Sequence, residues 1–248
     1  MRKIIICILS FVTLSLLPSC QRQPKHVVSV STEAIPVDAK TEPLADRAYE
    51  AQLAPFKAEL EKEMSVQIGY APERLWVDSP ECPMLNWATD ALWEAAKQAY
   101  DGRVDIAIVN MGGMRCEWPA GSVTRSSVFE LMPFENHLVV LTLKGSDVLD
   151  LCQSFATFGG QGVAGMRVEA KGGKLTKVTV GGKPVQPNAL YTVATSDYLS
   201  GGTDHMVALT RYVDCWNSDL LIRELYLQAV QQQDTIRAAV DGRMNIQP

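Results

Sequence analysis

The sequence predicts an α+β domain: a single domain with a mixed β-sheet flanked by helices. Segments with helical periodicity lie near the two ends of the domain, and strand-like segments separated by glycine turns lie between them. In addition, residues 104–109 form a short, almost uniformly apolar run, which is typical of a buried strand. Together these observations place helices and a mixed sheet around one core.

The first predicted element is a helix over residues 46–64. Its apolar side chains Leu53, Phe56 and Leu60 share one stripe at helical spacing. Pro55 lies inside this pattern. Because proline lacks the amide hydrogen that a helix uses, we expect a kink or a break there.

The other elements follow from hydrophobic period and from turn residues. Residues 64–71 alternate like a strand, and residues 83–100 place leucine and alanine on one helical face. Glycine pairs at 172–173 and 181–182 separate later strands. The remaining predicted strands are 104–109, 137–143, 168–170, 175–180 and 191–195, and the remaining predicted helices are 147–158 and 219–233.

Composition limits the class of protein. Of 248 residues, 47% are hydrophobic and 21% are charged, which is the balance of a globular protein and not of a disordered, collagen-like or polytopic membrane chain. The formal net charge is −5. A general nucleic-acid binder usually needs a basic face to neutralise phosphates, so this charge argues against that function.

The segment 1–19 has the layout of a secretory signal. Arg2 and Lys3 precede an apolar stretch, residues 4–17, that is too short to span a bilayer comfortably. Cys20 follows soon after, and this arrangement resembles the bacterial lipoprotein signal, which implies cleavage before Cys20 and lipidation of that cysteine. The alternative is an ordinary signal peptide with a chance cysteine.

Residues 20–45 are polar and rich in proline, which predicts a tether, although residues 26–30 could add an edge strand. The lipoprotein resemblance implies an exported protein, anchored by lipid to the bacterial cell envelope on the periplasmic or cell-surface side of the outer membrane. The folded domain is expected over residues 46–248.

Four cysteines lie within the predicted domain: Cys82, Cys116, Cys152 and Cys215. They are far apart and lack CxxC spacing, so they do not favour a zinc site. In an exported chain they could form disulfides, but free cysteine is also a common core residue, and both interpretations stay open.

Three loops carry residues suited to ligand binding. The first, Asn110 to Arg115, follows the apolar run 104–109. Its glycines, Gly112 and Gly113, would let the backbone approach a ligand, and the Arg115 guanidinium offers a rigid fork for phosphate or carboxylate. The simpler interpretation is a tight turn whose arginine forms a surface ion pair.

The other two loops each offer an aromatic ring. Phe134 precedes the strand 137–143 and could stack on the flat face of a base, although phenylalanine more often packs in the core. Tyr198 and Asp204 follow the strand 191–195. A carboxylate such as that of Asp204 can accept hydrogen bonds from both hydroxyls of a ribose, but it can equally cap a helix at a turn.

In combination these loops resemble the C-terminal domain of the 5′-nucleotidase family. The resemblance rests on the stretches DIAIVNMGGMRCEWPAGSVTRSSVFELMPFENHLVVLTLKGSDV and GKPVQPNALYTVATSDYLSGGTDHM, which stand in the family's order. The segment 79–86 with Asp90, and the closing segment 241–243, add to it. The resemblance extends over residues 46–248.

The resemblance implies that this domain grips the nucleoside part of a substrate, while a separate domain holds two metal ions. Phe134 and Tyr198 would sandwich the base, and Asp204 would hold the ribose hydroxyls. Asn110 and the two glycines would line the base and sugar site, and Arg115 would reach toward the phosphate. The implied substrate-binding residues are Asn110, Gly112, Gly113, Arg115, Phe134, Tyr198 and Asp204.

Two departures from the family pattern bear on the phosphate. Relatives commonly carry a second phosphate-directed arginine where this chain has Pro80. The third loop reads Gly-Gly-Thr-Asp where Gly-Gly-Asp-Gly is usual, although Asp204 keeps its spacing from Tyr198. We therefore expect a weaker grip on phosphate than in the two-domain enzymes.

The family's metal-binding segments do not occur in this sequence. A dimetal phosphoesterase site needs several His, Asp and Asn ligands, whereas His26, His137 and His205 form no ligand cluster. The expectation is that this chain has no catalytic residue, metal or other cofactor of its own. Two divalent metals would then reside in a separate partner chain.

Two functions from different classes follow. In the first, the chain is the nucleoside-binding component of a 5′-nucleotidase and is inactive alone. It would act in extracytoplasmic nucleotide hydrolysis with a separate dimetal phosphatase chain. In the second, it is a surface lipoprotein that captures nucleosides or nucleoside 5′-monophosphates without a catalytic partner. A third interpretation is a scaffold whose loops no longer bind a ligand.

Overall fold

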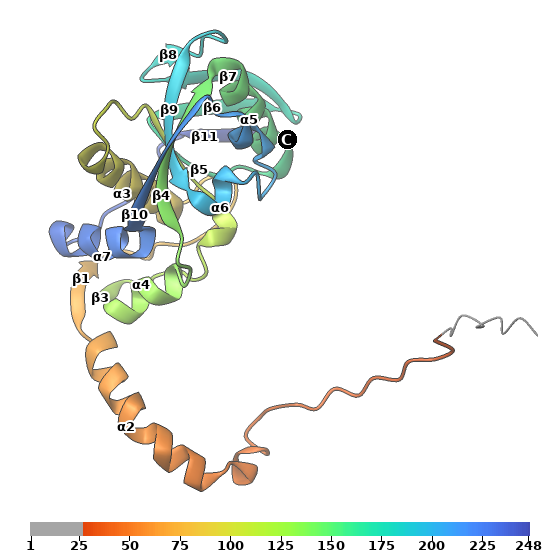
Figure 1. Ribbon diagram of the computed structural model, residues 1–248, viewed down its shortest axis with the longest axis vertical. Coiled ribbons are helices and arrows are strands. Elements are labelled where there is room, and N and C mark those ends of the chain that lie inside the picture. The colour runs from red at the N-terminus through yellow and green to blue at the C-terminus, as the bar shows by residue number, and fades with distance from the viewer. Residues whose placement is uncertain (1–26) are drawn as a thin grey trace, which may run out of the picture. The chain divides into compact units, whose positions relative to one another are not determined.

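The computed structural model describes residues 27–248 (Figure 1), so the predicted signal, Cys20 and the first residues of the tether lie outside the described residues. The chain divides between Gln52 and Leu53 into two compact units. In the first unit, residues 27–30 are exposed and form no strand, so the edge strand considered for this segment is not formed by them. A short 3-10 helix, Glu42–Leu44, follows.

Helix α2, Arg47–Met64, runs through Pro55 without a break and has no buried residue. Of the kink or break expected at Pro55, the break is therefore wrong. Proline removes the hydrogen bond to the carbonyl of Ala51, but that residue is exposed, so water can satisfy the oxygen. Within residues 27–248, no helix is both long and apolar enough to span a bilayer.

The centre of the second unit is a five-stranded sheet. Strands β2 and β9 pair in parallel, whereas the other neighbours pair antiparallel, so the predicted mixed sheet is confirmed. The strands, in spatial order, are β10 (Asp214–Leu221), β4 (His137–Lys144), β9 (Leu190–Ser196), β2 (Ile106–Val109) and β5 (Gly162–Ala164).

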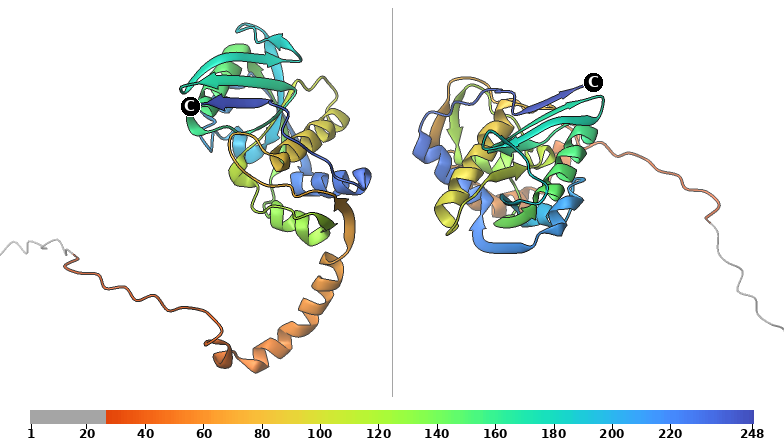
Figure 2. Two further views of the ribbon diagram at one scale, coloured as in Figure 1. Left: turned by 180° about the vertical axis from the view of Figure 1, so that it is seen from behind. Right: turned by 90° about the horizontal axis from the view of Figure 1, so that it is seen from above.

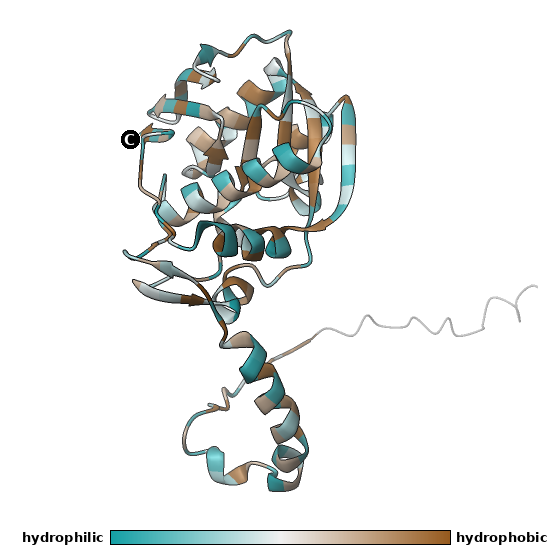
Figure 3. Cartoon of the chain, turned by 90° about the vertical axis from the view of Figure 1, so that its left-hand side faces the viewer, coloured by the Kyte–Doolittle hydropathy of each residue, from teal (hydrophilic) through white to brown (hydrophobic). Residues whose placement is uncertain are grey.

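This sheet is covered on both faces, and Figures 1 and 2 show α3 (Pro83–Ala99) and α7 (Ile222–Gln233) on one side and α5 (Gly145–Phe158) on the other. Because successive side chains of a strand point to opposite faces, β2 serves both cores. Ala107 and Val109 join the cluster with α3 and α7, and Ile106 and Ile108 join the cluster with α5. This two-sided burial explains why β2 is apolar throughout, and Figure 3 shows hydrophobic strands enclosed by helices with hydrophilic outer faces.

Two smaller sheets complete the unit. The other elements are the strands β1 (Gln67–Ala71) and β3 (Gly121–Thr124), the sheet of β11 (Met244–Gln247), β6 (Met166–Lys171), β7 (Lys174–Val180) and β8 (Lys183–Pro184), the helices α4 (Arg125–Leu131) and α6 (Asp197–Ser200), and the 3-10 helices η2 (Met111–Gly113) and η3 (Val207–Arg211). In the structure all four cysteines of the domain are free thiols, and no disulfide joins any two of them.

One predicted helix begins later than expected. Residues 219–221 belong to strand β10, and α7 starts at Ile222. Strand β10 pairs only with β4 and lies at the edge of the sheet. An edge strand tolerates polar residues on both faces, so its sequence does not show the alternation that identifies a half-buried strand.

The segment that follows α7 is fastened to the start of α3 by a buried glutamate. Glu81 accepts hydrogen bonds from the side chain of Asn86 at 2.7 Å and from the backbone amides of Asp241 at 2.9 Å and Gly242 at 3.1 Å. With the backbone amide of Met244 at 3.4 Å, four donors satisfy a carboxylate that would otherwise be costly to bury. The two outlying motifs of the sequence, 79–90 and 241–243, therefore meet in space.

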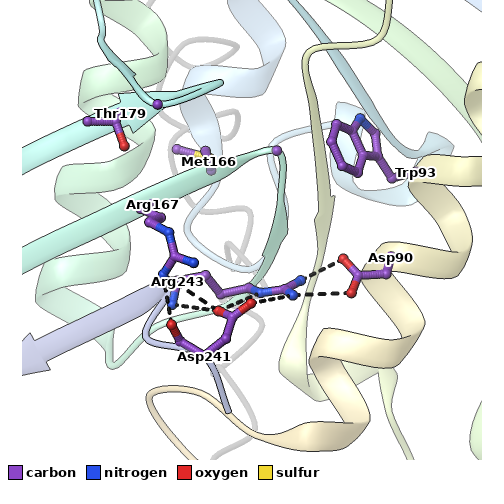
Figure 4. Close-up of a pocket in the computed structure, with 9 residues that line it drawn as sticks. Asp90, Trp93, Met166, Arg167, Thr179, Asp241 and Arg243 are labelled. Carbon is purple, nitrogen blue, oxygen red and sulfur yellow. Dashed lines mark hydrogen bonds and ion pairs between the residues drawn. The ribbon is translucent and has the colours of Figure 1, made fainter. Parts of the chain in front are cut away.

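Arg243 strengthens the same junction. Its guanidinium binds the Asp90 carboxylate through two hydrogen bonds, at 2.6 and 3.1 Å, and Asp241 at 2.9 Å (Figure 4). Desolvation alone would lower the pKa of Arg243, but these two carboxylates outweigh it and raise that pKa. Although a hollow adjoins this cluster, its charged groups are already paired with each other, which indicates a structural role.

Candidate functional site

The three predicted loops open at one edge of the five-stranded sheet. Because β2 and β9 are parallel neighbours, their carboxyl ends lie at the same edge, and because β4 is antiparallel to β9, its amino end lies there too. The loop after β2, the loop before β4 and the loop after β9 therefore converge. Sheet topology, and not proximity in the sequence, assembles the site.

A pocket of about 320 Å³ lies between these loops. All seven predicted residues line it, so the structure brings every one of them together; their role in binding substrate stays a prediction. Asn136 also lines the pocket and was missed. The sequence signal that could have identified Asn136 was its place in the same loop, two residues after Phe134. The lining residues are Asn110, Gly112, Gly113, Arg115, Phe134, Asn136, Tyr198 and Asp204.

The first loop is shaped by its own backbone. The amide of Gly113 donates to the carbonyl oxygen of Asn110 at 3.1 Å, and the amide of Met111 donates to the side chain of Gln161 at 2.7 Å. A Cβ atom at Gly113 would lie only 2.7 Å from Asn110 Oδ1. Glycine is therefore required there if the Asn110 side chain is to keep its place over the loop.

Asn110 and Tyr198 hold the carboxylate of Asp204 from two sides. The Asn110 amide, with 8% of the residue exposed, donates to Asp204 Oδ2, and the Tyr198 hydroxyl donates to Asp204 Oδ1 at 3.4 Å. Each carboxylate oxygen keeps a further lone pair for a ligand. Asp204 thus lines the pocket and does not cap a helix, and its φ of +51° marks a left-handed backbone that non-glycine residues seldom adopt.

The two aromatic rings are accessible. Phe134 is 39% exposed and Tyr198 is 46% exposed, and both line the pocket. Phe134 is therefore not a core residue. Apolar rings at the wall of an open pocket provide flat surfaces on which another ring can stack.

Arg115 is an exposed residue of the loop after β2 and lines the pocket. Its backbone amide is fixed to the carbonyl oxygen of Leu131 at 2.9 Å, and its guanidinium donates one hydrogen bond, to the carbonyl oxygen of Gly112 at 3.2 Å. Within residues 27–248 it takes part in no ion pair, so the surface ion pair considered above is not found. Most of its donors can reach an anion.

The two described histidines have local partners. His137 Nδ1 lies 3.3 Å from Asp197 Oδ2, and the His205 ring stacks on Phe158 with a centroid distance of 3.8 Å. In the part of the chain that the structure describes, no three His, Cys, Asp or Glu side chains are grouped to hold a metal ion. The residues described here do not fit a dimetal centre.

The fold and the pocket together define an α+β domain with a pocket built from three loops. The sequence profile of the family described as "5′-nucleotidase, C-terminal domain" matches residues 67–211. The chain belongs to this family.

Relatives of known name agree with this assignment. A 5′-nucleotidase of Vibrio cholerae is 27% identical over 230 residues, which cover 89% of this chain and 41% of the relative. Protein UshA of Escherichia coli is 27% identical over 184 residues, or 71% of this chain and 33% of the relative. The chain therefore spans about two-fifths or less of the length of these curated relatives.

Solved structures confirm the fold class. The crystal structure of a 5′-nucleotidase precursor from Thermus thermophilus superposes with a TM-score of 0.72 at 24% identity, covering 81% of this chain and 43% of that one. The NAD nucleotidase of Haemophilus influenzae gives a TM-score of 0.64 at 21% identity, covering 82% and 42%. At these identities the likeness establishes the α+β fold.

Proposed function

We propose that the pocket binds the nucleoside part of a nucleotide. The observation that carries this proposal is the convergence of two accessible rings, an oriented carboxylate and a guanidinium that forms no ion pair among the described residues, all around one pocket. A base stacks on aromatic faces, a ribose diol donates to a carboxylate and a phosphate accepts from arginine. All three parts of a nucleoside 5′-monophosphate thus have a chemical partner in one place.

In this arrangement Phe134 and Tyr198 enclose the base, and the amide of Asn136 lies where it can reach a base edge. Asn110 keeps the Asp204 carboxylate turned into the pocket, so the carboxylate is oriented before the ribose arrives. Such preorganisation avoids the entropy cost of ordering the side chain during binding. Stacking alone accepts either purines or pyrimidines.

We further propose that the chain takes part in extracytoplasmic nucleotide hydrolysis together with a separate dimetal phosphatase chain. The described residues do not fit a metal centre, so no chemical step is assigned to them. Their contribution is to bind the nucleoside and hold the phosphate at the mouth beside Arg115, where a partner's site can reach it. Export and a lipid anchor at Cys20 belong to this proposal and are supported by the sequence pattern of residues 1–20.

Titration of the purified mature chain tests the proposal. Isothermal titration calorimetry with adenosine, AMP and UMP should give saturable binding at a single site. As a matched ligand, 2′,3′-dideoxyadenosine should bind more weakly than adenosine, because it has no diol to donate to Asp204. Saturable binding by none of the nucleosides would contradict the proposal. If the chain binds nucleosides but does not increase phosphate release by a secreted metallophosphatase, the alternative function, capture of nucleosides without a catalytic partner, would be favoured.

A further inference from the structure

The two ring-bearing loops are linked by one side chain outside the pocket. Asp197 is the first residue of α6 and immediately precedes Tyr198, while His137 is the first residue of β4 and follows Phe134 by three positions. The β4–β9 ladder reaches the pair Leu138 and Ser196. Directly beyond that pair, the two chains turn away into the loops that carry the rings.

Both carboxylate oxygens of Asp197 contact residues at the point where the two chains separate. Its Oδ1 accepts from the backbone amide of His137 at 3.1 Å and from the backbone amide of Tyr198 at 2.8 Å. Its Oδ2 lies 3.3 Å from His137 Nδ1. One oxygen atom therefore binds a backbone amide of each loop, which ties the spacing of the two chains to the position of a single side chain.

Each loop also has an anchor of its own. The carbonyl oxygens of Phe134 and Asn136 accept from Arg223 at 3.3 Å and from the amide of Ile222 at 2.9 Å, both at the start of α7. On the other side, the Tyr198 carbonyl oxygen accepts from the Thr203 hydroxyl at 2.8 Å. Among the side-chain hydrogen bonds of the described residues, only those of Asp197 join one ring-bearing loop to the other.

We infer that Asp197, with His137, is a positioning pair that sets the separation of the Phe134 and Tyr198 rings. This inference rests on the proposed function, in which a base lies between those rings. Dispersion contacts weaken steeply with distance, so a small increase in the gap loses contact on one face of the base. The pair itself is half-exposed, at 40% for His137 and 44% for Asp197, so its contribution to global stability is small.

The test measures adenosine affinity of the mature chain by calorimetry, with melting temperature recorded for every variant. Asp197→Ala should weaken binding about fivefold, which corresponds to the net contribution of about one ordinary hydrogen bond. Asp197→Asn should remain within about twofold of the wild type, because its amide oxygen still accepts from both backbone amides. Glu169→Ala is the matched control. It removes the ion pair that Glu169 forms with Lys177 between β6 and β7, in a sheet that does not border the pocket, and should leave affinity unchanged.

A double-mutant cycle separates positioning from a merely structural role. If Asp197 acts through the Tyr198 ring, Asp197→Ala should have almost no further effect in a Tyr198→Ala background, where ligand-observed NMR can follow weaker binding. The same fivefold loss in both backgrounds would overturn the inference, as would an Asp197→Ala affinity equal to that of Glu169→Ala.

A second variant covers the case in which Asp197→Ala unfolds. His137→Ala keeps the backbone hydrogen bond and removes only the imidazole, so it should weaken adenosine about twofold, and an unchanged affinity would then overturn the inference. A silent Tyr198→Ala, or a wild type that does not bind adenosine, would instead overturn the proposed function itself. A Tyr198→Ala effect without an Asp197→Ala effect would overturn the positioning pair alone.

Discussion

Asn110 illustrates how single residues prepare this site. It is buried, its carbonyl oxygen shapes the η2 turn, and its amide orients the carboxylate of Asp204. Glycine at 113 leaves room for the same side chain. A substitution of Asn110 would disturb both the η2 turn and the orientation of the Asp204 carboxylate. Ligand affinity and melting temperature must therefore be measured together for variants at this position. The exposed residues of the pocket are simpler to test.

The two rings give the sharpest test at this scale. Phe134→Ala and Tyr198→Ala should each weaken adenosine binding by about 1–3 kcal/mol, the usual contribution of one base–aromatic stack. Tyr198→Phe should be nearly silent, because the ring face carries the contact and the hydroxyl makes only a long hydrogen bond to Asp204, at 3.4 Å. Calorimetry measures affinity, and melting temperature serves as control. A sharp loss of stability with unchanged affinity in the folded fraction would contradict the sandwich.

Arg115 should distinguish ligands by their phosphate. Arg115→Ala should weaken AMP by about 1.5–3 kcal/mol, the range for a hydrogen bond to a charged group, and leave adenosine unaffected. The difference between the two ligands, measured on the same protein, removes any general effect on folding. Equal weakening of both would show that Arg115 supports the loop and does not bind phosphate.

At this scale the sequence carried most of the information. The seven residues implied by the family resemblance all line the pocket, because the sheet brings the three loops that carry them to one edge. Asn136 escaped notice because an amide in a loop has no distinctive pattern. Asp197 was equally hidden, since its role depends on the pairing of β4 with β9, and register between distant strands cannot be read from one sequence.

Among the elements, the junction of α3 with the segment leading to β11 holds the end of the domain. Glu81 accepts hydrogen bonds from this segment, Arg243 within the segment binds Asp90 of α3, and β11 then adds to β6 in parallel. Removing one member leaves its partner charge without compensation. Charge at this junction therefore ties the C-terminal strand to α3 and makes its stability depend on pH.

The pH dependence has a definite sign. The hydrogen bond from Arg243, helped by the charges of Arg243 and Arg167, lowers the pKa of Asp241 despite some desolvation. A carboxyl whose folded pKa is lowered contributes stability above its unfolded pKa of about 3.9, and this contribution is lost as pH falls through the folded value. The free energy of unfolding, measured with urea, should therefore fall as pH decreases from about 5 to about 3. Asp241→Asn should flatten this fall.

The control for that prediction is Glu59→Gln, which removes an exposed carboxylate from α2. It should leave the slope of stability against pH between about 5 and about 3 close to that of the wild type. If Asp241→Asn and Glu59→Gln gave the same slope, the lowered pKa of Asp241 would have no measurable effect on folding.

Element boundaries show where sequence reasoning reached its limit. Buried strands such as β2 were evident because both faces contact a core. Strand β10 was taken in part for helix because an edge strand lacks a clear alternation, and helix α2 continued through Pro55 because solvent can satisfy the freed carbonyl. Short strands, among them β3 and β5, were missed because three or four residues hold too little of a period to recognise.

At the scale of the whole molecule, the proposed function divides binding from chemistry. The family's relatives named here are more than twice as long as the matched region, and the residues described for this chain form the proposed nucleoside pocket without a grouped metal site. Binding energy from base and ribose would then be used to hold a phosphate in place for another active site. This division predicts that the isolated chain binds nucleosides but does not hydrolyse nucleotides.

The purified mature chain should accordingly release no phosphate from AMP when manganese, cobalt or zinc is added. In a dimetal phosphoesterase the metals supply the attacking hydroxide and stabilise the leaving oxygen, and no group of side chains that could hold such metals occurs among the described residues. A malachite-green assay of released phosphate makes the measurement, with a two-domain 5′-nucleotidase as positive control. Contaminating phosphatases are recognised with the Phe134→Ala/Tyr198→Ala double variant, purified in parallel: activity present equally in both preparations comes from the host. Metal-dependent release that disappears with the two rings would belong to this chain, and binding and chemistry would then not be divided between two proteins.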